Sequence, residues 1–206
     1  MTVTLDPANK AVSVTLTNGN LTATSSSTAS AVFSTTSQSS GKWFFEITTT
    51  NDSSQNNEFG TGSVTGHNVN HFLESDGGIA FVYSGSGVWD QFGGSGGTFN
   101  TYTPGASLTV SVCLDIGNGK IYLIVDGTHK VCGDAGAGTG GVTIVPDVAG
   151  FYVGVVPTFP PTTAQTVNFG ATPFVAAIPT GYTSWDGSQT SGGGGSPAIL
   201  LGQRLL

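Results

Sequence analysis

Charged residues are scarce in this chain. Only 8% of its 206 residues are Asp, Glu, Lys or Arg, against about 25% in an average soluble domain. Five residues are basic, and the formal net charge is −7. Phosphate backbones are bound by clustered Lys and Arg, so we expect no nucleic-acid partner. The basic residues lie far from one another in the sequence: Lys10, Lys42, Lys120, Lys130 and Arg204.

Long apolar runs are also missing. The uninterrupted apolar stretches are short, whereas a helix needs about 20 apolar residues to cross a bilayer. The N-terminal sequence MTVTLDPANK has no basic start followed by an apolar run. We therefore expect no membrane partner and no signal peptide. Folding is expected in a reducing cytoplasm.

Cysteine is rare. Cys113 and Cys132 are the two cysteines of the chain, too few for a zinc site or a redox motif. The surrounding strand VSVCLDI predicts a buried thiol at Cys113. A disulfide between Cys113 and Cys132 is the alternative.

Helix signals are nearly absent, and strand signals run along the whole chain. Short segments rich in Val, Ile, Thr, Phe and Tyr alternate with Gly, Asn, Ser and Pro, a pattern typical of strands and turns. Eleven strands at about ten-residue spacing predict an all-β, two-sheet antiparallel sandwich, with a barrel as the alternative. The expected strands are 11–16, 20–24, 30–35, 42–49, 58–64, 78–84, 87–92, 107–116, 120–127, 150–157 and 163–170.

Residues 108–127 form the best-defined hairpin. Val110, Val112 and Leu114 alternate with more polar residues, which gives the first strand one strongly apolar face. The sequence 117–119, Gly-Asn-Gly, predicts the tight turn, with positive φ values. Another glycine-rich stretch, residues 133–141, is predicted as a flexible connection.

The end of the chain changes character after residue 186. We expect a sandwich over 1–186 and a Gly/Ser linker over 187–196, because SGGGGS has linker composition. Residues 197–206, PAILLGQRLL, are apolar and are predicted to anchor the chain, either on its own sandwich or on another subunit. The anchor residues are Pro197, Ile199, Leu200, Leu201, Leu205 and Leu206.

An ordered series of sequence blocks begins at residue 40. The blocks are SGKWFFEITTT (40–50), FGTGSVTG (59–66), GGIAFVYSGSGVWDQFGG (77–94), VSVCLDIGNGKIYLIVDG (110–127), GFYVGVVP (150–157), VNFGATPF (167–174) and IPTGYTSWD (178–186). In sequence and order they resemble the SPRY domain, and the match covers about residues 5–186. One departure is Val125-Asp126-Gly127, where the family more often has Asn-Gly. The residues that fill the family's hairpin and C-terminal motif are Asp115, Gly119 to Tyr122, Tyr152, Pro157, Asn168 to Gly170, Pro173, Phe174, Pro179 and Tyr182.

This resemblance implies a concanavalin-like sandwich used for binding or particle architecture. The charge-poor, Ser/Thr/Gly-rich sequence is similar to SPRY-like domains of bacteriophage virion proteins. It implies a structural virion protein (capsid decoration, head fibre or tail-associated), partnered by other virion subunits and forming a homo-oligomer. The alternative is an adhesin module that recognises a carbohydrate or peptide, such as a host surface glycan.

Catalytic motifs are incomplete. Glu74-Ser75-Asp76 begins the carboxylate pattern of some glucanases, but the second Glu is missing. His67 and His71 have residue types that bind zinc, although a surface loop is the favoured interpretation. No nucleophile elbow or phosphate-binding loop is present. We therefore expect no enzyme activity, no metal and no cofactor.

Aromatic residues in glycine-rich loops are the remaining candidates for a binding surface. Trp89, Phe92, Phe99 and Tyr102 lie in or beside such loops, where rings can stack on sugars or peptides. Packing inside the sandwich is the alternative role for Trp89, and it is the favoured role for Trp43 and Trp185.

Overall fold

The computed structural model of the chain describes residues 2–50, 57–70, 79–83, 89–92, 107–145, 147–157 and 163–192. At ten strand positions (50, 57, 79, 80, 82, 83 and 89–92) it describes the backbone alone. The described residues contain strands and turns and no helix. The strands are β1 (Leu5–Lys10), β2 (Val14–Thr17), β3 (Thr22–Ser25), β4 (Val32–Gln38), β5 (Lys42–Thr50), β6 (Asn57–Ser63), β7 (Ile79–Tyr83), β8 (Trp89–Phe92), β9 (Ser107–Asp115), β10 (Lys120–Val125), β11 (His129–Lys130), β12 (Gly133–Asp134), β13 (Thr139–Gly140), β14 (Val142–Thr143), β15 (Phe151–Val156), β16 (Gln165–Asn168) and β17 (Thr183–Ser184).

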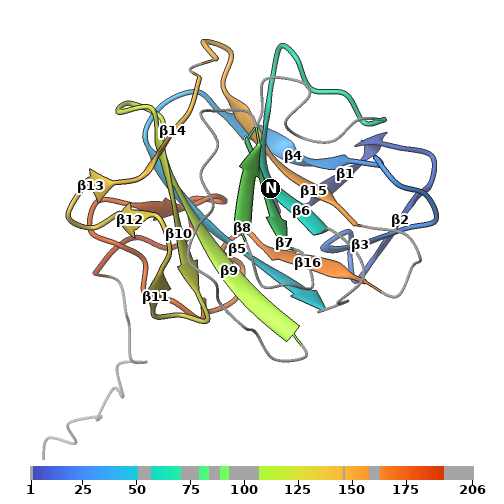
Figure 1. Cartoon of the computed structure of the whole chain (residues 1–206). Coiled ribbons are helices and arrows are strands. Elements are labelled where there is room, and N and C mark those ends of the chain that lie inside the picture. The colour runs from blue at the N-terminus through green and yellow to red at the C-terminus, as the bar shows by residue number, and fades with distance from the viewer. Residues whose placement is uncertain are drawn as a thin grey trace, which may run out of the picture.

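All of these strands except β12 and β13 form the two layers of a sandwich (Figure 1). One sheet has the order β1-β4-β15-β6-β7-β8. The other has the order β11-β10-β9-β5-β16-β3-β2, with β14 beside β10 and β17 beside β5. The described pairings are antiparallel except that of β17 with β5. The predicted all-β antiparallel sandwich is confirmed.

All eleven strands expected from the sequence are present. Six further strands were not expected: β1, β11, β12, β13, β14 and β17. β1, with the sequence LDPANK, pairs irregularly with β4 although it contains Pro7. Within the glycine-rich stretch 133–141, β12 and β13 pair with each other, so this connection contains a small two-stranded sheet.

The predicted hairpin is formed by β9 and β10, which pair from Lys120↔Asp115 to Val125↔Val110. In the turn, Gly119 alone of residues 117–119 has positive φ, at 60°. The Asp115 carboxylate shapes the turn by accepting hydrogen bonds from the main-chain N–H of Asn118, at 3.1 Å, and from its side-chain amide, at 2.8 Å. The turn therefore depends on a side-chain acceptor as well as on glycine.

The main core lies between the two sheets. Alternate residues of strands such as β5, β9, β10 and β15 point into it, as the two-residue period of a strand requires. Val110, Val112 and Leu114 belong to this core, as the alternation in β9 predicted. The aromatic side chains of the core are Phe45, Phe59, Phe81, Phe151, Phe169 and Trp185.

The outer face of the nine-stranded sheet is buried over β5, β9 and β10. Phe44, Cys113 and Tyr122 form a second apolar cluster there with residues of the covering segment, which we define as residues 171–182. This segment contributes Ala176 and Tyr182 to the cluster. The apolar part of this face is therefore covered by the chain itself.

Glu46 fixes the covering segment to the sheet. Its side chain is buried on β5. The carboxylate accepts hydrogen bonds from Ser111 Oγ at 2.8 Å and from the main-chain N–H groups of Val175 and Ala176, each at 2.9 Å. These partners compensate for burying the charge.

The structured chain extends beyond the boundary predicted at residue 186. Thr183 forms a bridge with Thr190, and the main-chain N–H of Ser191 donates to Tyr182 O at 3.0 Å. The side chain of Gln189 donates to the carbonyl groups of Gly170 and Thr172. Residues 187–191 thus pack on the sandwich, whereas the rest of the predicted linker, 193–196, lies outside the described residues.

Candidate functional site

Two of the four predicted ligand-binding aromatic residues, Trp89 and Phe92, lie in β8. Trp89 and Phe92 are its first and last residues, and they pair with Tyr83 and Ala80 of β7. β8 is an edge strand of the six-stranded sheet. Phe99 and Tyr102 lie outside the described residues. The binding role of these four residues stays a prediction.

The predicted anchor of Pro197, Ile199, Leu200, Leu201, Leu205 and Leu206 also lies outside the described residues. Its role stays a prediction. Among the described residues there is no helix with the length and apolar character needed to cross a membrane.

His67 has a packing role. Its ring lies edge-on to Phe33 and Tyr152, with centroid distances of 4.8 and 4.9 Å. Nδ1 lies 3.1 Å from the carbonyl oxygens of Ser63 and Val64, so it must carry the proton that it donates. Nε2 lies 3.1 Å from Asn9 Nδ2 and accepts its hydrogen bond. Both ring nitrogens are therefore engaged in internal contacts.

His71, Glu74 and Asp76, the other residues of the predicted zinc alternative, lie outside the described residues. Within the part of the chain that the structure describes, no three His, Cys, Asp or Glu side chains come close enough together to hold a metal ion. Cys113 and Cys132 are free thiols, the first buried and the second half-buried.

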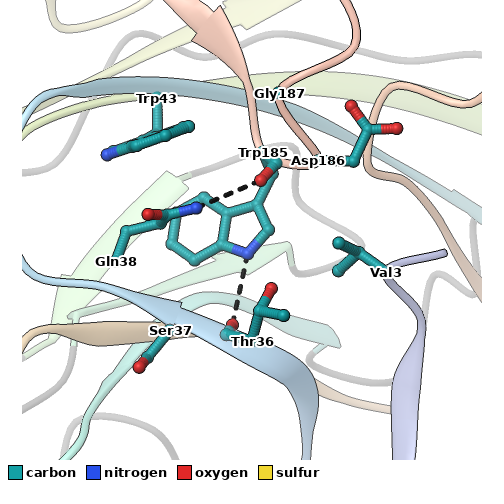
Figure 2. Close-up of a pocket in the computed structure, with 8 residues that line it drawn as sticks. All are labelled: Val3, Thr36, Ser37, Gln38, Trp43, Trp185, Asp186 and Gly187. Carbon is teal, nitrogen blue, oxygen red and sulfur yellow. Dashed lines mark hydrogen bonds between the residues drawn. The ribbon is translucent and has the colours of Figure 1, made fainter. Parts of the chain in front are cut away.

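A hollow of about 360 Å³ is the candidate binding site that the described residues form (Figure 2). It lies where the end of β4 meets the start of β5, the N-terminal segment and the residues that follow β17. The elements that form the hollow are distant from one another in sequence, so no local sequence motif predicted it. The lining residues are Val3, Thr36, Ser37, Gln38, Trp43, Trp185, Asp186 and Gly187.

Trp185 lies at the centre of this group in Figure 2 and is held on several sides. Only 1% of the residue is exposed. The indole Nε1 donates to the carbonyl oxygen of Thr36 at 3.3 Å, and the Trp185 carbonyl accepts from Gln38 Nε2 at 3.2 Å. The indole also packs edge-on against Phe45 at 5.5 Å. Trp185 is therefore a fixed, buried support for the hollow, in agreement with its predicted packing role.

Trp43 is half-buried at the rim of the hollow. Its Nε1 donates to the carbonyl oxygen of Ser40 at 2.6 Å. Its ring lies edge-on to that of Trp185, with centroids 6.1 Å apart and planes at 65°. These two contacts fix the orientation of a partly exposed indole. Trp43 thus contributes to packing, as predicted, and also presents an aromatic surface to the hollow.

Asp186 supplies the charge of the hollow. Its Oδ1 accepts hydrogen bonds from Ser188 N at 2.9 Å and from the hydroxyls of Ser184 and Ser188, both at 2.7 Å. Oδ2 accepts no hydrogen bond from the residues that the structure describes. One carboxylate oxygen of Asp186 therefore shapes the turn 184–188.

The cationic side chain next to Trp43 in sequence is paired with a residue outside the hollow. Lys42, which precedes Trp43, forms an ion pair of 2.9 Å with Asp115. Burial raises the pKa of Asp115, but the hydrogen bonds from Lys42 and Asn118 outweigh it and lower the pKa. The Asp115 carboxylate is thus ionised and balances Lys42, and among the residues that the structure describes Asp186 is the one ionisable residue in the lining of the hollow.

Comparison with known proteins shows the fold. No family model matches the chain, and no curated protein matches it either. Solved structures do match. The SPRY domain of human HERC1 has a TM-score of 0.58 and 18% identity over 82% of this chain and 99% of that one. The stonustoxin structure has a TM-score of 0.57 and 18% identity, with 81% of this chain and 26% of that chain covered.

These comparisons place the protein in the class of two-layer, antiparallel β-sandwiches. Within that class its fold is SPRY-like, as the sequence blocks predicted. At 18% identity the likeness concerns the fold alone.

Proposed function

We propose that this chain is a non-enzymatic bacteriophage virion protein that displays a SPRY-like sandwich on the particle. In this proposal the chain is attached to a capsid, head-fibre or tail subunit through residues 197–206. The observation that carries the proposal is a sandwich whose outer apolar cluster on β5, β9 and β10 is covered by the chain itself, followed in sequence by a glycine-rich stretch and an apolar end. Such a domain holds its shape without a partner, and the end of the chain is left for attachment.

Two of the three buried carboxylates among the described residues have partners that hold the sandwich together, which supports a role without catalysis. Glu46 is occupied by the covering segment and Ser111. Asp115 is occupied by Lys42 and Asn118. A glycosidase needs a pair of carboxylates that face a substrate, whereas each of these holds the sandwich together. The scarcity of charge fits a neutral surface exposed on a particle.

Incorporation into virions tests the proposal. The full chain and a chain ending at Gly192 would each be expressed in host cells during phage infection, and purified particles would be examined by mass spectrometry. We expect the full chain in the particles and the truncated chain in the soluble fraction, folded but unattached. Truncation after Gly192 keeps the contact of Ser191 with Tyr182, so the sandwich stays intact.

A matched variant distinguishes the effect of the apolar side chains on incorporation from the effect of chain length. Replacing Leu200, Leu201, Leu205 and Leu206 by Ser keeps the length and should abolish incorporation. If the truncated chain is incorporated like the full one, the anchor role is wrong. If the full chain is absent from purified particles, the virion role is wrong.

The hollow at Trp43 favours a second candidate function, a binding module that recognises a carbohydrate or a peptide on the host surface. A partly exposed indole with polar neighbours is a common arrangement in ligand sites. The fluorescently labelled full chain should then bind intact host cells. Absence of cell binding would contradict this second function and leave the virion role standing.

A further inference from the structure

We infer that the covering segment is itself a contact surface, and that its exposed apolar residues pack against the particle subunit that holds residues 197–206. The inference rests on the attachment proposed above and assigns a second contact with the same partner. The contact surface consists of Pro173, Val175 and Ala177. The partner surface that fits it is apolar and uncharged.

The covering segment has an exposed apolar side. Ala176 is buried in the second apolar cluster, and the half-buried Phe174 packs against that cluster. The residues that alternate with them, Pro173, Val175 and Ala177, are exposed, and 62% of Val175 is accessible to solvent. An extended segment with water on one side normally alternates apolar and polar residues. This segment is apolar on both sides, and contiguous exposed apolar residues mark interaction sites.

The exposed side of the segment carries no charge. Residues 148–185 contain no Asp, Glu, Lys or Arg. The carboxylate beneath the segment, that of Glu46, is buried. The chain approaches the segment at Pro179 with the loop after β12, and there Lys130 and Asp134 form an ion pair with each other. A partner would meet apolar side chains with no charge to neutralise, so an uncharged surface is complementary to the segment.

Val175 is held in place by contacts within the chain. Its main-chain N–H donates to the Glu46 carboxylate at 2.9 Å. It also packs against the turn after β10, where a Cβ added to Gly127 would lie 3.2 Å from Val175 Cγ1. A partner therefore meets a surface that is already ordered, so little conformational entropy is lost on contact.

The chain leaves the sandwich at the base of the covering segment. The main-chain N–H of Gly181 donates to Ser191 Oγ at 2.8 Å, and the main-chain N–H of Ser191 donates to Tyr182 O at 3.0 Å. Gly181 and Tyr182 are the last two residues of the covering segment. Gly192 is the last residue that the structure describes. The chain that continues to residue 206 therefore starts beside this segment.

The short glycine-rich stretch keeps the partner close to the same place. Pro197 follows Ser191 by six residues, and an extended chain covers at most about 3.6 Å per residue, or about 22 Å in all. A flexible glycine-rich chain of this length spans about 13 Å on average. A domain of about 100 residues has a radius of gyration of about 13 Å. A subunit that holds Pro197 is therefore large enough to touch the covering segment, and the tether favours even a weak contact there.

Competition for incorporation tests the inference. The Val175→Glu full chain and the unchanged full chain, with different peptide tags, would be expressed together in host cells during phage infection. Their ratio in purified particles would be measured by mass spectrometry. We expect the variant to be depleted at least about tenfold, because the new charge would have to be buried against an apolar partner. Val175→Ser removes apolar surface without adding a charge and should be depleted about threefold.

Val12→Glu is the matched control. Val12 is 97% exposed and lies just before β2, the edge strand of the nine-stranded sheet farthest in strand order from β10 and β11. This variant should be incorporated like the unchanged chain. Thermal unfolding checks that each variant is folded, and if Val175→Glu does not fold, Val175→Ser decides the test.

The inference is overturned if the folded Val175 variants are incorporated as well as Val12→Glu. It is also overturned if the chain ending at Gly192 self-associates in sedimentation experiments and Val175→Glu abolishes that association, because the partner would then be a second copy of this chain. These two results leave the attachment standing. Absence of the unchanged full chain from the particles, or incorporation of the chain ending at Gly192, rejects the attachment and this inference with it.

Discussion

The side-chain amide of Gln38 donates a 3.2 Å hydrogen bond to the main-chain carbonyl of Trp185 and so links the two sheets of the sandwich. Gln38 ends β4 in the six-stranded sheet, and Trp185 follows β17 in the nine-stranded sheet. Both residues line the hollow. The contact therefore ties the shape of the candidate site to the relative position of the layers.

Loss of the Glu46 carboxylate should destabilise the sandwich strongly. Glu46→Leu leaves the N–H groups of Val175 and Ala176 and the hydroxyl of Ser111 without their acceptor. We expect the free energy of unfolding to fall by about 3 kcal/mol, measured by urea denaturation. Asp6→Asn is the control, because Asp6 accepts one exposed backbone hydrogen bond and should change stability by less than about 0.5 kcal/mol. Equal effects of the two variants would reject the anchoring role of Glu46.

Gly170→Ala tests the close approach of the motif 168–170 to the turn that carries Asp186. Gly170 has a φ of 133°, and an added Cβ would lie 2.6 Å from Ser184 Cβ and would also meet Asp186 Oδ1. Thermal unfolding should show a loss of about 2 kcal/mol or more.

Gly138→Ala is the matched change for Gly170→Ala. Gly138 also has positive φ, at 68°, but an added Cβ would meet no atom within 4 Å. We expect a loss of about 1 kcal/mol there from the backbone conformation alone. If Gly170→Ala lowers the free energy of unfolding no more than Gly138→Ala does, the steric overlap expected at Gly170 is contradicted.

Asp147 should make the stability of the 142–150 connection dependent on pH. Burial raises the pKa of its carboxyl, but hydrogen bonds from Ser63, Thr65 and Ala149 outweigh it and hold the pKa well below its usual value. Because the folded pKa is depressed, the stabilisation is fully present above the unfolded pKa of about 4 and is lost as the pH falls toward the folded pKa.

Asp147→Asn should therefore destabilise the protein at pH 7 by about 1 kcal/mol or less, since solvent screens the site. The difference in the free energy of unfolding between the variant and the wild type should shrink as the pH is lowered below about 4. Urea denaturation at several pH values measures it. A difference that stays constant or grows in acid would show that the charge of Asp147 does not contribute.

Both cysteines should react slowly in the folded protein. Burial raises the pKa of Cys113 well above its ordinary value and raises that of Cys132 to about 11. At pH 8 about one thiol in a thousand at Cys132 would be a thiolate, the reactive form. Labelling with a chromogenic disulfide reagent should therefore be slow in buffer and rapid in denaturant, where two reactive thiols per chain should be detected. If no reactive thiol is detected in denaturant without a reductant, the two cysteines form a disulfide.

Ligand binding at the loop aromatic residues and ligand binding at the hollow predict opposite results for one double variant. Trp89→Ala with Tyr102→Ala removes rings predicted to stack on a ligand and leaves every residue of the hollow in place. If the hollow is the binding site, the fluorescently labelled double variant binds intact host cells as well as the unchanged chain does. A folded double variant that has lost host-cell binding would place the ligand on the loops.

Local patterns predicted the strands well because burial imposes a two-residue period on each of them. The alternation in β9 and the Gly-Asn-Gly turn together predicted the hairpin, whereas its register, with Lys120 opposite Asp115, is known from the structure. β1 was missed because Asp6 and Pro7 disfavour a strand, yet pairing with β4 overrides that preference. The covering segment was missed as well, because its contact with Glu46 joins residues about 130 positions apart, which no local window samples.

The hollow could not be predicted for a similar reason. Val3, Gln38, Trp43 and Asp186 come together only after the two sheets have packed. The sequence identified Trp43 and Trp185 as residues of the SPRY-like blocks and favoured packing for both, which is right for Trp185 and incomplete for Trp43. The surface of Trp43 that faces the hollow follows from the orientation set by Ser40 and Trp185.

The central claim, display of this sandwich on a virion, is tested most directly by imaging the chain on the particle. Purified virions would be decorated with a Fab raised against the folded chain and examined by cryo-electron microscopy. The account predicts Fab density at regular positions on the outside of the capsid or tail, and loss of that density for particles made with the chain ending at Gly192. Virions that carry no Fab at any position, although the Fab binds the purified chain, would contradict the account.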